Sequence, residues 1–278
     1  MNAATATLAA RSFHEWPLVV FTTLAVGGAG LLTAPLLSLA APGPWAPAAL
    51  AVRWGVALLA IGLAVSLAHL GKPLRAPLTA AGLGRSRLSA EVLAAGLATL
   101  AGAAAALLPS VSPALDVAAG ICAVAFLVTL GLVYALPGQQ TWGGVVAWMP
   151  LTTGLGLGAV SLAASRGEAL AVGAVPIVVL AADAALLVVR RTSLVRRSAT
   201  LLPRYPAAFE HAQALLFARL VLVDILPGAC LLAGFRRTGV ALFALGLLAD
   251  RLAFYGLAAQ RTTESELARV EGIIASGV

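Results

Sequence analysis

The chain has 278 residues, of which 61% are hydrophobic and only 10% are charged. Soluble domains carry about a quarter charged residues, so this composition excludes an ordinary soluble enzyme and predicts an all-α polytopic membrane protein. The net charge of +7 does not indicate nucleic-acid binding, because the basic residues flank apolar stretches.

Eight apolar stretches are long enough to cross a membrane, which takes about 20 residues. They occupy residues 15–39, 49–70, 88–108, 114–136, 143–163, 168–189, 211–234 and 238–259. Turns rich in proline and glycine separate many of them, as in APGPWAP at 41–47 and PGQQ at 137–140. No internal repeat is visible, and we predict a single membrane domain over residues 1–278.

Eight spans place both termini on one side of the membrane, here called side X; the opposite side is called side Y. The basic residues on X are Arg11, Lys72, Arg75, Arg85, Arg87, Arg190, Arg191, Arg196, Arg197, Arg204, Arg261 and Arg269. Those on Y are Arg53, Arg166, Arg236 and Arg237. The positive-inside rule therefore predicts that X is cytoplasmic. An acidic partner docked on X would select the same distribution, so both explanations stay open.

Ionisable residues gather at the X ends of several spans. His14 and Glu15 open the first span, His69 closes the second, and Glu91 lies one turn inside the third. The residues expected at similar depth are Tyr134, Trp142, Asp183 and His211. Each also has an ordinary interpretation as an interfacial residue, a helix cap or a surface pair. Ionisable groups below the headgroups are costly, and their convergence from separate stretches favours a functional site.

Deeper charges lie on the last two spans. Arg219 and Asp224 share the seventh span, and Asp250 and Arg251 are adjacent on the eighth. Opposite charges on neighbouring helices predict a buried ion-pair network, with a proton path as the alternative. Cys122 and Cys230 lie in apolar runs without CxxC spacing, so we expect no iron–sulfur cluster and no metal site in this chain.

A histidine and carboxylate cluster at a membrane face has the chemistry that a quinone head group needs. Histidine exchanges a proton near neutral pH, and a neighbouring carboxylate relays protons to water. The isoprenoid tail would enter between apolar helices. Because the chain has no electron carrier of its own, the electrons would have to leave to a docked partner.

Four motifs carry a family resemblance: HEWPL at 14–18, HLGKPLRAPL at 69–78, LSAEV at 88–92 and YALPGQQTW at 134–142. At these residues the chain resembles the membrane anchor subunit of dimethyl sulfoxide reductase (DmsC), a family similar to the polysulfide reductase and NrfD-like anchors. The first 95 residues carry the specific part of the resemblance, and the second half of the chain matches mostly in hydropathy. The resemblance implies an NrfD-like arrangement of eight helices in a bacterial inner membrane.

The resemblance also implies a role and partners. Such anchors bind menaquinol or ubiquinol without haem or iron–sulfur cluster, and they exchange electrons with a four-cluster iron–sulfur subunit and a molybdopterin subunit. The implied function is a non-catalytic, quinol-reactive subunit of an anaerobic respiratory oxidoreductase, with quinol oxidation favoured over quinone reduction. The implied quinone-binding residues are His69, Glu91, His14, Tyr134 and Trp142. Glu91, Glu15 and Asp183 are the expected proton-transfer residues, and Arg75, Arg190, Arg191, Arg196 and Arg197 the expected docking residues.

Two other functions stay open from the sequence. A small-solute or proton transporter would have broken helices and a polar cavity near mid-membrane. A haem b carrier with two haems would want four histidines, and the chain has three.

Overall fold

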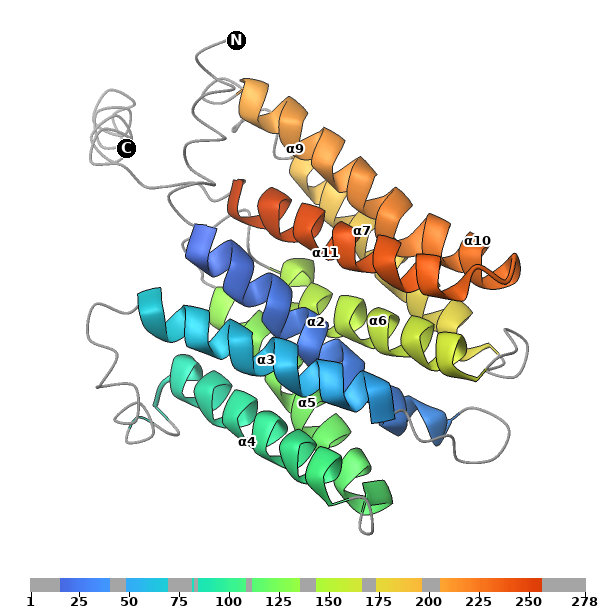
Figure 1. The fold of residues 1–278 in the computed structure, drawn as a ribbon. Helices are drawn as coiled ribbons and strands as arrows, with labels where there is room; N and C mark the ends of the chain where they lie inside the picture. Colours follow the sequence, from blue (N-terminus) through green and yellow to red (C-terminus); the bar gives the residue numbers. More distant parts are fainter. Residues whose placement is uncertain are drawn as a thin grey trace.

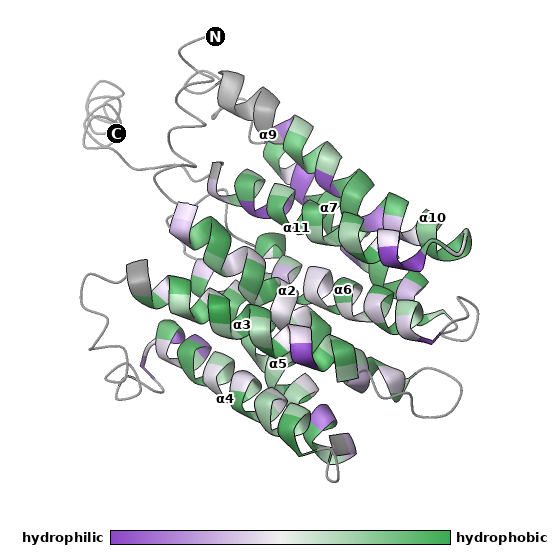
Figure 2. Cartoon of the chain, viewed as in Figure 1, coloured by the Kyte–Doolittle hydropathy of each residue, from purple (hydrophilic) through white to green (hydrophobic). Residues whose placement is uncertain are grey.

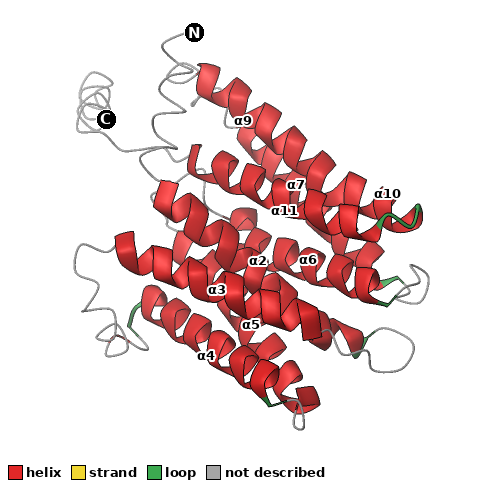
Figure 3. Cartoon of the chain, viewed as in Figure 1, coloured by secondary structure: helices red, strands yellow, loops and turns green. Residues whose placement is uncertain are grey.

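The computed structural model describes residues 16–40, 49–69, 82, 85–108, 112–135, 144–166, 174–196 and 206–256. All regular secondary structure in these ranges is helical (Figure 3). Lipid offers no hydrogen bonds to an exposed backbone, and a helix satisfies its own peptide groups internally. Apolar residues dominate the helices (Figure 2), which confirms the all-α fold that the composition predicts.

The described part of the chain contains eight long helical segments, and Figure 1 shows their arrangement. The first four are α2 (Trp16–Ser38), α3 (Ala49–His69), α4 (Arg87–Leu107) and α5 (Ser112–Tyr134). The fifth joins the short 3₁₀ helix η3 (Gly144–Trp148) to α6 (Met149–Ser165), and the sixth is α7 (Val175–Arg196). The seventh combines α9 (Pro206–Arg219), the π-helix η5 (Leu220–Ile225) and α10 (Leu226–Leu232), and the eighth is α11 (Arg236–Gly256).

Seven of these segments are long and apolar enough to cross a membrane by length and composition. The segment outside that group is α7, which carries Asp183, Arg190, Arg191 and Arg196. Its 22 residues nevertheless match the length of its neighbours, because 1.5 Å per residue gives about 30 Å. Seven candidate spans among eight long helices make this a multi-pass membrane protein.

The sixth span differs from the sequence prediction. We expected it to end at residue 189, but α7 continues to Arg196. Arg190 does not start a loop, because it is buried and paired inside the protein. Arg191 and Arg196 lie on the exposed side of the extended helix. Hydropathy alone ended the span at the first pair of arginines, whereas tertiary pairing allows the helix to continue.

The helices form two groups of four. In Figure 1, α3, α4 and α5 lie with α2 on one side, and α7, α9–α10 and α11 lie with α6 on the other. We call these groups the N-terminal bundle (α2–α5) and the C-terminal bundle (η3–α11). Helix α2 joins them, because it packs against α3 and α5 in its own bundle and against α6 and α11 in the other. It is buried along most of its length, as expected for a helix that is apolar on all sides.

Glycines permit the closest helix contacts. A Cβ atom on Gly30 of α2 would lie 2.7 Å from the backbone oxygen of Gly154 on α6. A Cβ atom on Gly131 of α5 would overlap the carbonyl oxygen of Ala147 in η3. Small residues let helix backbones approach closely in membranes, where van der Waals packing drives association. These contacts join the two bundles through their backbones.

The π-helix η5 has a local explanation in the sequence. Pro227 has no N–H, and its ring would clash with the carbonyl four residues earlier in a regular α-helix. The backbone N–H of Leu226 instead bonds to the carbonyl oxygen of Val221, five residues before it. The wider turn also brings Arg219 and Asp224 onto one face, because five residues of regular α-helix rotate about 500° and would separate them.

Candidate functional site

Side X corresponds to the left end of the helices in Figure 1, where α2 and α4 begin and α3 and α11 end. Arg87 fixes this end of the N-terminal bundle. Its Nη1 atom donates to the backbone oxygens of Leu132 and Ala135 at 3.0 Å each. A cation at the last carbonyls of a helix satisfies groups that lack an intrahelical partner. The beginning of α4 is therefore tied to the end of α5, beside Tyr134.

Glu91 is buried one turn inside α4, with 5% of its surface exposed. Among the described residues, no side chain donates a hydrogen bond to its carboxyl group, and none forms an ion pair with it. A buried carboxyl inside a membrane helix is costly unless something pairs with it or uses it. This matches the expected position of Glu91 and makes it the strongest candidate for a functional group on this side.

Tyr134 at the end of α5 meets α11 of the other bundle. Its hydroxyl lies 2.7 Å from the hydroxyl of Tyr255. The Tyr134 ring packs edge-on against Phe254 at 5.1 Å between ring centroids and against Tyr255 at 6.1 Å. Thr22 of α2 adjoins the Tyr255 hydroxyl, and Glu91 is close enough to act electrostatically on both phenols. The predicted residues Glu91 and Tyr134 therefore lie within electrostatic range of each other.

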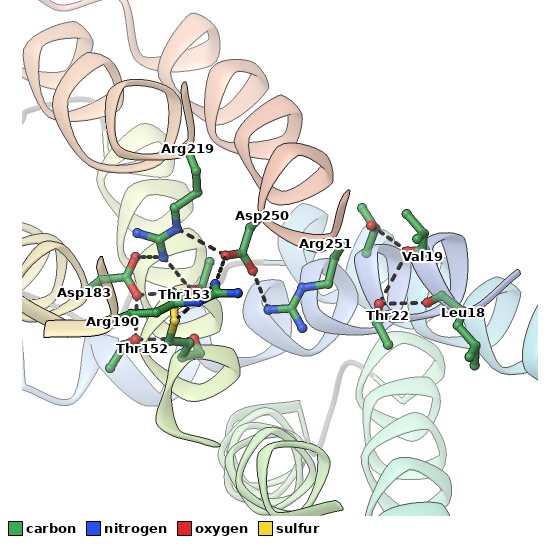
Figure 4. A network of polar contacts seen from close by, with 12 residues as sticks. Leu18, Val19, Thr22, Thr152, Thr153, Asp183, Arg190, Arg219, Asp250 and Arg251 are labelled. Atoms are coloured by element: carbon green, nitrogen blue, oxygen red, sulfur yellow. Dashed lines mark hydrogen bonds and ion pairs between the residues drawn. The ribbon is translucent and has the colours of Figure 1, made fainter. Parts of the chain in front are cut away.

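A cluster of six charged residues, the ion cluster, adjoins these aromatic rings, because Arg190 and Arg251 lie over Phe254. Figure 4 shows part of the cluster around Arg219 and Asp250. Its members are Asp183, Arg190, Arg219, Asp224, Asp250 and Arg251, and all are buried. They come from α7, α9, η5 and α11, with Thr152 and Thr153 of α6 at its edge. Three arginines balance three aspartates, so the cluster is formally neutral. The ion-pair network that the sequence predicts is confirmed, and it is larger than the four residues expected.

Arg219 is the centre of the ion cluster. It bonds Asp183 through Nη2, Asp224 through Nη1 at 2.9 Å, and lies 3.5 Å from Asp250 through Nε. Its Nη2 atom also donates to the Thr153 hydroxyl at 2.9 Å. One guanidinium therefore contacts four helical segments. Its fork of N–H donors suits this geometry better than a lysine ammonium would.

The part of the ion cluster nearer side X contains Asp250 between two arginines. Arg251 donates to Asp250 at 2.5 Å, and Arg190 lies 3.5 Å from the same carboxylate. The Arg251 guanidinium carbon is 5.4 Å from the Phe254 ring centroid, and that of Arg190 is 5.9 Å away. Phe254 in turn packs edge-on against Tyr255 at 5.1 Å. The ion cluster is thus joined to the tyrosine pair through Phe254.

Two predicted residues are placed differently from the sequence expectation. Arg190 was expected on the docking surface, but it is 2% exposed and bonded within the ion cluster, so that expectation is wrong. Asp183 was expected near the X surface, but it belongs to the ion cluster with Arg219. The extension of α7 to Arg196 places Asp183 about 20 Å along the helix from that end. Arg191 and Arg196 are exposed as expected, and Arg191 donates to Gln213 at 3.0 Å.

The remaining predicted residues are only partly described. His69 is the last residue of α3, at the X end, but its side chain lies outside the described part of the structure, as does that of His211 in α9. The site residues that lie wholly outside the described residues are His14, Glu15, Arg75, Trp142 and Arg197. Within the described ranges, no group of three His, Cys, Asp or Glu side chains is arranged to hold a metal ion.

Sequence reasoning missed Tyr255 and Phe254. The available signal was the segment DRLAFY at 250–255, in which Asp250 and Arg251 precede Phe254 and Tyr255 by four residues each. Residues four apart share one face of a helix, so the charged pair and the aromatic pair face the same way. The prediction from this segment used its charged residues and not its aromatic ones.

Comparison with known proteins identifies the family of the chain. No curated protein resembles the chain at a significant level. The profile of one protein family matches residues 10–257, a range that contains all eight long helical segments and the cluster of polar residues. The chain therefore belongs to the family of DMSO reductase anchor subunits (DmsC).

Proposed function

We propose that this chain binds quinol within the membrane and passes its electrons to an iron–sulfur subunit docked on side X. The family supplies the general role, a membrane anchor subunit of DMSO reductase. The observation that carries the proposal is the Glu91 carboxyl, which is buried without a described partner. Quinol oxidation releases protons, and a carboxylate within the apolar layer is suited to receive them.

The surroundings of Glu91 support this assignment. His69 ends α3 on the same side on which α4 begins, so both residues belong to the X ends of neighbouring helices. The tyrosine pair adds two hydroxyls that can donate to or accept from a quinone oxygen. Electron transfer to a docked subunit requires the quinone to lie near that subunit, and exposed Arg85, Arg191 and Arg196 give this face a positive charge.

The test uses the assembled complex with its catalytic and iron–sulfur subunits. Menadiol, a soluble naphthoquinol, would reduce the iron–sulfur clusters of the complex, and optical bleaching would follow the reaction. We expect His69→Ala and Glu91→Gln to abolish this reduction, while reduced benzyl viologen, which donates directly to the partners, still reduces the clusters. Asp116→Asn is the matched control, because Asp116 is equally buried but lies near the start of α5 on side Y. Normal menadiol kinetics in Glu91→Gln would contradict the assignment of Glu91 to the quinol site.

A second candidate function is proton translocation through the C-terminal bundle. The π-helix η5 and the buried charges near the middle of the helices favour it, because interrupted helices and intramembrane charges mark transport paths. Against it, each aspartate of the ion cluster is paired with at least one arginine. Menadiol oxidation by the complex in proteoliposomes tests this function. A pH change beyond that expected from quinol chemistry, lost in Asp183→Asn, would support translocation.

A further inference from the structure

We propose that Arg251 and the Tyr134–Tyr255 hydroxyl pair form the subsite for the second oxygen of the quinone, opposite the oxygen served by Glu91. This inference rests on the proposed quinol-binding function and deepens it. It adds Arg251 and Tyr255 to the site. It also gives a part of the ion cluster a role in binding.

The first observation is that the Arg251 guanidinium has unused hydrogen-bond donors. Only 1% of Arg251 is exposed, and one of its nitrogens donates to Asp250. Its Nε and Nη1 atoms are buried and have no hydrogen-bond acceptor among the described residues. Buried donors are normally satisfied, and a charged group left with free N–H bonds is costly in a low-dielectric interior. Arg251 therefore has the capacity to hold an oxygen atom of a ligand.

The second observation is that the Glu91 carboxyl and the Arg251 guanidinium both lie within electrostatic range of the Tyr134 and Tyr255 hydroxyls. The two charged groups form no ion pair with each other in the described structure, although each has unused hydrogen-bonding capacity. The Arg251 guanidinium carbon lies 5.4 Å from the Phe254 ring centroid, and Phe254 packs against both tyrosine rings. The neighbourhood of the two hydroxyls therefore contains both an acceptor and unused donors.

A quinol head group matches that polarity. It has oxygens at opposite ends of one flat ring, so one O–H can donate to Glu91 while the other oxygen accepts from Arg251 or a tyrosine hydroxyl. The flat ring suits a site bounded by aromatic side chains. A cation beside the second oxygen stabilises the negative charge that develops there as its proton leaves, and this effect is strongest where water is excluded.

The oxidation step balances with these groups. Both O–H bonds of the quinol break, and two electrons pass one after the other to the iron–sulfur clusters of the docked subunit, each of which carries one electron at a time. One proton moves directly to Glu91, which releases it to water at side X. The other moves along the Tyr255 and Tyr134 hydroxyls, each accepting one proton as it gives up another, and reaches Glu91 after the first has left. Arg251 remains protonated throughout, because a guanidinium is not deprotonated in proteins.

The charge balance of the ion cluster makes a clean variant possible. Replacing Arg251 alone would leave three aspartates against two arginines, which destabilises a buried cluster. The double variant Asp250→Asn with Arg251→Gln leaves Arg190 and Arg219 against Asp183 and Asp224, so neutrality is kept. The matched control is Arg219→Gln with Asp224→Asn. It is equally balanced and removes a different buried pair of the ion cluster.

The experiment measures menadiol-driven cluster reduction in the assembled complex. We expect D250N/R251Q to raise the menadiol KM by about tenfold or more, since a hydrogen bond to a charged group contributes that much. Reduction by benzyl viologen should be unchanged. R219Q/D224N should keep a KM near that of the wild type. Arg251→Lys, which keeps the charge, should recover part of the affinity, whereas a purely structural role would show the same loss in both double variants.

The outcomes separate the two proposals. If the wild-type complex is not reduced by menadiol at all, the proposed function fails. If it is reduced, and D250N/R251Q has an unchanged KM, the second-oxygen subsite is overturned while quinol binding survives. If D250N/R251Q does not assemble, Tyr255→Phe decides, because it removes one hydroxyl without changing charge. An increased KM for menadiol in Tyr255→Phe supports the proposed subsite, and an unchanged KM contradicts it.

Discussion

The hydroxyl of Tyr134 lies 2.7 Å from the hydroxyl of Tyr255, and this bond connects the last turn of α5 to the last turn of α11. The two residues are 121 positions apart in the sequence and belong to different bundles. The bond therefore closes the X end of the interface between the bundles. The two phenol oxygens also lie within electrostatic range of the buried carboxyl of Glu91.

The stability of this contact is testable by a double-mutant cycle. Tyr134→Phe or Tyr255→Phe alone leaves one buried hydroxyl without its partner, and we expect a loss of about 1–3 kcal/mol in unfolding free energy. The double variant removes both hydroxyls and should lose less than the sum of the single variants. Thermal unfolding of the purified protein in detergent would measure all four proteins. Strictly additive losses would mean that the two hydroxyls do not depend on each other.

Among the residues of the C-terminal bundle, Arg219 should contribute most to the stability of the folded bundle. Arg219→Met leaves Asp183 and Asp224 without their main cation, and we expect a loss of about 3–5 kcal/mol, seen as low yield and an early thermal transition. Arg191→Met is the control on α7, because Arg191 is exposed and a surface cation contributes about 0–1 kcal/mol. Equal yields and equal thermal transitions of the two variants would show that the ion cluster does not stabilise the fold.

A pair of glycine substitutions tests the backbone contact between α5 and η3. Gly131→Ala places a methyl group where the carbonyl oxygen of Ala147 lies, so it should force the helices apart and cost about 1–3 kcal/mol. Gly96→Ala on α4 meets no atom within 4 Å and should be neutral or stabilising by up to about 1 kcal/mol. Thermal unfolding in the same detergent compares them. A stable Gly131→Ala protein would mean that α5 and η3 are not in this close contact.

Docking on side X should depend on Arg191 and Arg196 but not directly on Arg190. Charge reversal of the two exposed arginines should weaken co-purification with the iron–sulfur subunit, and the effect should diminish as salt is raised. Arg190→Glu should instead reduce the yield of the anchor itself, because it places a second negative charge against Asp250. A well-folded Arg190→Glu protein that only fails to assemble would restore Arg190 to the docking surface.

Loop charge predicts that side X is cytoplasmic. Single cysteines at Arg85 on X and Thr238 on Y, both exposed, test this in a background without Cys122 and Cys230. An impermeant maleimide applied to intact cells should label Thr238→Cys and not Arg85→Cys. The reverse pattern would place X and the docked partner outside the cytoplasm, and it would leave the assignment of Glu91 unchanged.

Much of the fold follows from the sequence alone. An apolar stretch of about 20 residues in lipid has one stable backbone structure, so hydropathy predicted all eight helical segments within a few residues at most ends. Pairing of Arg219 with Asp224 and of Asp250 with Arg251 also followed from the sequence, because opposite buried charges have to find partners. The unusual position of Glu91 one turn inside a membrane helix was visible as well.

The tertiary structure decided which of these groups meet. In a soluble helix the apolar stripe shows which face points inward, but these helices are apolar on nearly every side, so the sequence gives little information about their rotation. The burial of Arg190, the pairing of Tyr134 with Tyr255, and the central position of Arg219 all depend on that rotation. The π-helix at Leu220–Ile225 changes the direction in which the side chains after it point around the helix axis. No periodic pattern in the sequence predicts this change. Long-range packing thus brings Tyr255 to Tyr134 and Arg251 to Phe254, whereas the lengths of the helices were determined by the sequence.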